Sequence, residues 1–232
     1  MLKTLVKKQL MEIFRSYFYN AKTNKKRSTA GIIAYILLFA ALMIGLIGGM
    51  FTGLSVSLCA PLTQAGMGWL YFALMSLLAI FLGAFGSVFN TYSGLYFAKD
   101  NDLLLSLPIP VRTLMASRLL TVYLMGLMYS GVVVLPAIIV YWATVSAAPL
   151  HLLAGVLFLL LISLFVMAIS CLLGWVVAKI SLKLKHKSIM TVLVSLLGIG
   201  LYYFIYFKAQ TVISDLVANA VVYGVKIKGA AY

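Results

Sequence analysis

The side chains that could bind a metal or act as nucleophiles are few in this sequence and lie far apart. The histidines are His151 and His186, and neither has a carboxylate or a cysteine at a metal-ligand spacing. Cys59 and Cys171 form no metal or redox motif and imply no disulfide framework. Serine-based hydrolysis would need a buried base, and the apolar stretches carry no His or Lys at their centres. We therefore expect no catalytic site, no metal site and no cofactor, and we expect that the chain is not an enzyme.

The composition instead indicates a protein whose apolar surface is in contact with lipid. Of the 232 residues, 64% are apolar and 9% are charged, and the mean hydropathy is +1.12. Soluble domains carry about 25% charged residues. A soluble fold of this length could not bury so much apolar surface, so the sequence predicts an integral membrane protein.

The net charge of +14 does not indicate nucleic-acid binding, because of where the charges lie. Fifteen of the 18 Lys and Arg residues fall in three clusters at the edges of apolar segments, within residues 3–27, 99–118 and 179–187. Such clusters retain loops on the cytoplasmic side of a membrane. We expect the N-terminus and both internal basic loops to be cytoplasmic, and the protein to lie in the plasma membrane with no nucleic-acid partner.

Two stretches without any charged residue, 28–98 and 119–178, are each too long for one membrane crossing. About 20 helical residues span the hydrocarbon core, so each stretch is expected to fold back once, around residues 52–65 and 143–151. A further span follows the last basic cluster. The predicted spans are residues 31–51, 67–90, 119–142, 150–177 and 189–207.

Residues outside these spans complete an expected all-α, polytopic helical bundle. Residues 1–30 are predicted to form an interfacial amphipathic helix over 2–18 and a basic linker; a calmodulin-like target helix is the alternative. The transmembrane domain covers residues 31–207. Residues 208–232 are expected to form an amphipathic tail on the outer face, or else the start of another, re-entrant pair of segments.

The cytoplasmic loop after the second span has the most informative sequence. Asp100 and Asp102 can cap a short helix, which contains Leu103–Leu105 and ends before Pro108. Pro110 suits the first turn of the next helix. The leucines are expected to stand exposed at the cytoplasmic edge of the membrane. They then either form a docking surface or dip into the lipid interface, and these two interpretations are equally open.

This loop resembles the one between the second and third spans of ABC-2-type transporter permeases. The matching positions are Asp102, Leu103–Ser106, Pro108 and Arg118, and the N-terminal helix is similar to the family's connecting helix. The resemblance implies a coupling helix that docks on a separate ATP-binding-cassette subunit. The residues implied in docking are Asp100, Asp102, Leu103, Leu104, Leu105, Ser106, Pro108 and Pro110. ATP hydrolysis is expected in that partner, since the chain lacks a G-x-x-x-x-G-K-[ST] loop. Family members usually have six spans, so the chain is expected to be the N-terminal portion of a longer permease.

Glycines on the first two predicted spans suggest close helix contacts. Gly45, Gly49 and Gly53 repeat at every fourth position, which permits close approach of another span, a second protomer or a second permease half. Gly83 and Gly86 are expected to allow a bend in the second span.

The function expected from the resemblance is that of the permease subunit of an ATP-driven exporter. Two alternatives stay open: an ion-coupled secondary transporter, and a membrane scaffold that recruits a cytoplasmic protein without transport. The absence of charged residues at the centres of the spans disfavours ion coupling, which usually requires them. The sequence does not identify a substrate.

Overall fold

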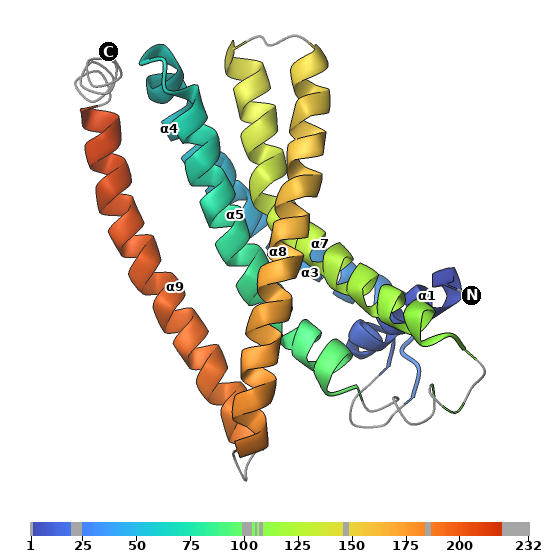
Figure 1. Ribbon diagram of the computed structural model, residues 1–232. Helices are drawn as coiled ribbons and strands as arrows, with labels where there is room; N and C mark the ends of the chain where they lie inside the picture. The colour runs from blue at the N-terminus through green and yellow to red at the C-terminus, as the bar shows by residue number, and fades with distance from the viewer. Residues whose placement is uncertain are drawn as a thin grey trace.

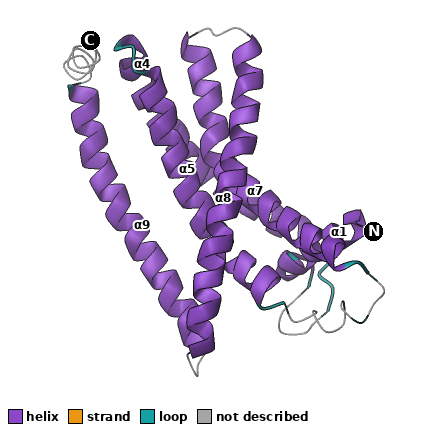
Figure 2. Cartoon of the chain, in the orientation of Figure 1, coloured by secondary structure: helices purple, strands orange, loops and turns teal. Residues whose placement is uncertain are grey.

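A computed structural model describes residues 2–19, 25–98, 104, 106, 109–145, 149–183 and 187–219. These residues are almost entirely helical (Figure 2). The β-type pairing among them is one isolated bridge between Tyr19 and Lys26. The helices are α1 Leu2–Ile13, α2 Arg15–Phe18, α3 Thr29–Ala40, η1 Ala41–Gly48, α4 Gly49–Gln64, α5 Gly68–Thr91, η2 Tyr92–Tyr96, α7 Val111–Val145, α8 Pro149–Lys183 and α9 Lys187–Ala218, where η marks a π-helix. The predicted all-helical fold is confirmed for the described residues.

Four helical segments of the described chain are long and apolar enough to cross a membrane. They are Thr29–Gln64, Gly68–Tyr96, Val111–Val145 and Leu153–Ser181. Lipid offers no hydrogen-bond partners to the backbone, so continuous helices are the expected form of such segments. This arrangement is compatible with a multi-pass membrane protein.

The turn between the first two of these segments is shorter than the sequence pattern suggested. The chain was expected to break within residues 52–65, but α4 continues to Gln64 and contains Pro61. The reversal is confined to the residues between α4 and α5, where Gly66 has a φ of 72°. A left-handed residue at this point suits glycine, because a Cβ would crowd the neighbouring carbonyl oxygen.

The centre of the molecule is the contact of α5, α7 and α8 (Figure 1). Tyr71 of α5 is fully buried and donates a hydrogen bond of 2.9 Å from its hydroxyl to the carbonyl oxygen of Ala137 on α7. Two buried serine pairs join the same helices: Ser87 Oγ lies 2.6 Å from Ser170 Oγ, and Ser130 Oγ lies 3.1 Å from Ser163 Oγ. Small polar residues at such contacts let apolar helices approach closely and still bond across the interface.

The fifth predicted span, 189–207, lies within α9. This helix leaves the lower end of α8 and stands to one side of the other helices in Figure 1. Residues 208–218, expected on the outer face, continue the same helix without a break. Residues 220–232 of the expected tail lie outside the described residues.

Candidate functional site

Helix α1 lies against the N-terminal part of α7, where three polar side chains of α7 are buried: Ser117, Arg118 and Thr121. A helix is present at Leu2–Ile13, within the residues predicted to be helical; its location at a membrane surface stays a prediction. Leu5 and Val6 of α1 are buried. On α7 the buried residues recur at helical spacing: Leu114, Ser117, Arg118, Thr121, Val122 and Met125. That spacing places them on one face of the helix.

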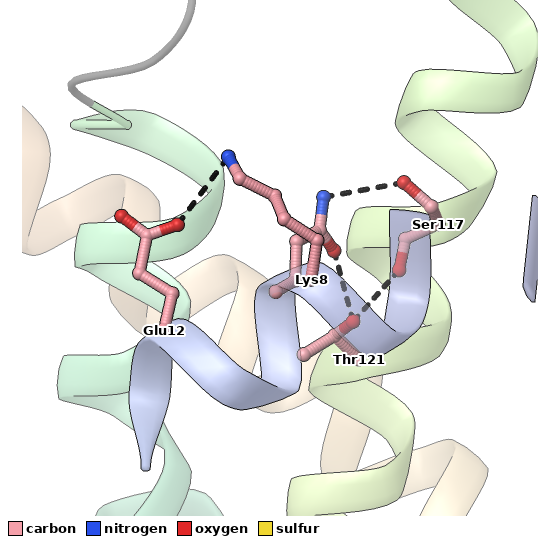
Figure 3. Close-up of polar contacts among 5 residues, drawn as sticks. Lys8, Glu12, Ser117 and Thr121 are labelled. Carbon is pink, nitrogen blue, oxygen red and sulfur yellow. Dashed lines mark hydrogen bonds and ion pairs between the residues drawn. The ribbon is translucent and has the colours of Figure 1, made fainter. Parts of the chain in front are cut away.

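Gln9 bridges α1 to two successive turns of α7. Its amide Nε2 donates to Ser117 Oγ at 3.2 Å, and its Oε1 accepts from Thr121 Oγ1 at 2.9 Å (Figure 3). Ser117 is fully buried and Thr121 is 5% exposed. Because Gln9 bonds to two successive turns of α7 at once, these contacts favour one register of α1 on α7. Lys8 and Glu12 form an ion pair of 3.5 Å on the exposed side of α1.

A small apolar cluster connects this junction to the loop that resembles a coupling helix. Leu104 packs with Leu5 of α1 and Leu114 of α7, and Ile109 lies against them. Leu104 is only 6% exposed. The expectation that the leucines of this loop are exposed is therefore wrong for Leu104, because α1 folds over it.

The other residues implied in docking are described only in part. Ser106 is exposed, and Pro110 is exposed immediately before α7, where its carbonyl oxygen accepts hydrogen bonds from the amides of Thr113 and Leu114. Five of the eight predicted docking residues lie outside the described residues: Asp100, Asp102, Leu103, Leu105 and Pro108. Their roles stay predictions.

A cavity of about 390 Å³ lies between α1, the end of α5, η2 and α7. Polar side chains line much of it: Gln9, Glu12, Asn90, Ser93, Arg118 and Thr121. Ile13, Phe97, Val122 and Met125 supply apolar wall. Arg118 is 5% exposed, so a guanidinium is held inside this junction. The volume lies within the range of small-molecule sites, which is about 300–1,000 Å³.

The π-helix η2 forms one wall of this cavity. Its hydrogen bonds to α8 hold it in place: Tyr92 Oη lies 2.8 Å from Ser181 Oγ, and Tyr96 Oη donates to the carbonyl oxygen of Cys171 at 3.0 Å. Single turns of π-helix occur frequently at functional sites, because they shift side chains relative to a regular α-helix. No motif in the sequence marks Gln9, Glu12, Asn90, Ser117 or Thr121 as functional residues. The sequence signal that could have indicated this site is the set of polar residues on one face at the start of α7, an otherwise apolar helix.

The glycines predicted to pack helices are not the ones that do so within this chain. A Cβ added at Gly45, Gly49 or Gly53 would meet no atom within 4 Å. An added Cβ at Gly83 would instead lie 2.8 Å from Val166 Cγ1, and one at Gly86 would lie 2.8 Å from Tyr129 Cγ. Gly83 and Gly86 therefore serve close packing, and α5 continues as a helix through both. The open face of the first segment leaves its predicted role in contacting another chain untested.

The remaining candidate residues that the structure describes lie in separate parts of the fold. Among the described residues, no group of three or more His, Cys, Asp and Glu side chains is arranged to hold a metal ion. His151 lines a separate cavity with Phe72, Tyr141 and Trp142, while His186 lies outside the described residues. Cys59 is buried and Cys171 is partly buried, and both are free thiols.

Comparison of this chain with protein-family models, curated proteins and solved structures yields no match.

Proposed function

We propose that this chain is a membrane-spanning permease subunit of an ATP-binding-cassette exporter, with the loop at residues 100–110 receiving a separate ATPase subunit. The resemblance of Asp102, Leu103–Ser106 and Pro108 to the ABC-2 loop motivates the assignment. The observation that carries it is the burial of Leu104 between α1 and α7. A displacement of the loop would reach a membrane-crossing helix directly through this contact.

The path from loop to membrane continues through packed side chains. Leu114 lies in the same cluster as Leu104, and α7 is packed along much of its length on α5 and α8. Close-packed interiors transmit displacement because they contain few voids that could absorb it. The proposed cycle therefore moves α1 and the start of α7 as one unit when the ATPase subunits close, and this movement alters the packing of α5, α7 and α8.

The test separates docking from transmission, using the chain co-expressed with a candidate ATP-binding-cassette ATPase subunit. The double change Leu103→Glu and Leu105→Glu should abolish co-purification of the ATPase, because two carboxylates oppose an apolar docking contact. Leu104→Ala should retain co-purification while transport falls, because it opens a void in the transmitting cluster.

Met11→Glu is the matched control, because Met11 is 51% exposed on α1 and lies outside the cluster. It should leave both measurements unchanged. Undiminished co-purification and undiminished transport after the double change would refute the proposal. A transport rate that survives ATP depletion and follows a proton or sodium gradient would favour a secondary transporter instead.

A further inference from the structure

The cavity between α1, η2 and α7 combines features that one class of ligand would satisfy together. Arg118 places a guanidinium in its buried wall, and Glu12 places a carboxylate at a position that is 56% exposed. Asn90, Ser93 and Thr121 add hydrogen-bonding groups, and Phe97 and Met125 add apolar surface. The lining is therefore cationic inside, anionic toward the opening and apolar over part of the wall.

Each part of this lining restricts the ligand. A guanidinium pairs well with phosphate oxygens, because its planar donors match their geometry. A purely anionic ligand would meet repulsion from Glu12, while a ligand that also carries an ammonium group would find a partner there. Apolar wall favours a ligand with hydrocarbon next to its charged group.

We propose that this cavity binds the zwitterionic head group of a glycerophospholipid of the phosphatidylethanolamine type. The phosphate lies against Arg118, the ammonium group lies at Glu12, and the glycerol with its first methylenes lies along Phe97 and Met125. Lys8 also pairs with Glu12, at 3.5 Å, but both side chains are largely exposed and such pairs contribute little. A ligand ammonium can therefore replace it.

The proposed site has a consequence for the protein. A lipid in this cavity would contact α1, η2 and α7 at once, and α1 is the helix that covers Leu104. Any ligand that binds one arrangement of these elements better than another shifts the population toward that arrangement. The lipid would thus stabilise the packing of α1 on α7. This inference is independent of the proposed export function, since it requires neither an ATPase nor a substrate.

Native mass spectrometry of the detergent-solubilised full chain tests the site with two probes, dioleoyl-phosphatidylethanolamine and dioleoyl-phosphatidylglycerol. The wild-type chain should bind the ethanolamine lipid several-fold more tightly than the glycerol lipid. Arg118→Gln should weaken binding of both lipids about tenfold, because it removes a charged hydrogen-bond donor. Glu12→Gln should weaken only the ethanolamine lipid, by about threefold, as expected for a partly exposed ion pair.

One further variant keeps the test decisive if Arg118→Gln fails to fold. A Cβ added at Gly94 meets no atom within 4 Å, and Gly94 lines the cavity, so Gly94→Leu fills the space while Arg118 is retained. It should abolish the lipid preference. The matched controls are Arg112→Gln, an exposed arginine on the same helix, and Gly200→Leu, an open glycine on α9. Both should bind lipid like the wild type.

Three results would overturn the proposal. Equal binding of the two lipids by the wild-type chain would exclude zwitterion recognition. Unchanged binding after Gly94→Leu would place the lipid elsewhere. An equal loss after Arg112→Gln and Arg118→Gln would indicate general attraction of lipid to basic residues. Failure of this test would leave the proposed docking of an ATPase untouched, because lipid retention is read without that partner.

Discussion

Gly83 of α5 faces Val166 of α8 so closely that a Cβ added to the glycine would lie 2.8 Å from Val166 Cγ1 and 3.0 Å from Cγ2. Val166 is fully buried, and its Cγ1 would also lie 3.1 Å from a Cβ added at Gly126 of α7. One branched side chain thus occupies the space left by glycines on two other helices. Here α5, α7 and α8 approach each other at a single level of the helical bundle.

Gly83→Ala should destabilise the protein, because the added methyl group meets Val166 where neither helix can withdraw freely. The expected cost is about 1–3 kcal/mol, typical of overpacking a close-packed contact. The measurement is the free energy of unfolding from SDS titration in mixed micelles. Val166→Ala in the same chain should recover part of the loss. Gly45→Ala is the control, since its Cβ would meet nothing within 4 Å. Equal stability of the Gly83 and Gly45 variants would contradict the packing described.

The bridge between Gln9 and Thr121 should be measurable as a coupling energy. Gln9→Ala and Thr121→Val each remove one partner of the hydrogen bond of 2.9 Å. A double-mutant cycle should give a coupling of about 0.5–1.5 kcal/mol, the usual net value of a partly buried hydrogen bond. Hydrogen exchange of the α1 amides reports the local stability. Replacing Gln9→Ala by Met11→Ala in the cycle should give additive effects, because Met11 is exposed. A coupling near zero for Gln9 and Thr121 would mean that the bridge does not hold α1.

Gly66→Ala should lower stability through the backbone alone. Gly66 has a φ of 72°, in the left-handed region that costs L-residues about 1–2 kcal/mol. Gly66→Asn should cost less, because asparagine tolerates this conformation better than alanine. The free energies of unfolding of the two variants give the comparison. If the alanine variant were as stable as the asparagine variant, the turn would not depend on the left-handed residue.

Single cysteines should report which side of the membrane each connection faces. In a chain with Cys59→Ala and Cys171→Ala, Gln64→Cys should react with a membrane-impermeant maleimide on intact cells. Gln64 is exposed at the turn between α4 and α5. Asn101→Cys should react only after the cells are opened, because basic residues flank that loop. Reaction of Asn101→Cys from outside intact cells would reverse the predicted orientation and remove the basis for ATPase docking.

Much of the helical framework follows from the sequence by itself. The uncharged stretches 28–98 and 119–178 predict two pairs of helices, and the structure has a pair of long helices in each. The hydropathy of each segment depends only on its own residues, so the sequence is enough to identify it. A segment this apolar is stable in lipid as a helix, because its backbone hydrogen bonds must be made within the segment. The turn was expected within residues 52–65, but it lies later in the chain. Pro61 is accommodated inside α4, and the chain reverses direction around Gly66.

The contacts between helices depended on the tertiary structure. Gly45, Gly49 and Gly53 have the spacing of packing glycines and lie on an open face, whereas Gly83 and Gly86 receive Val166 and Tyr129. Spacing along one helix does not reveal which side chain lies opposite. In the same way, the sequence placed Leu104 in an exposed loop, and only the folding of α1 over it buried that residue. The cavity around Arg118 arises because three elements distant in sequence meet there, and only their arrangement in space brings that cation, the carboxylate and the apolar wall together.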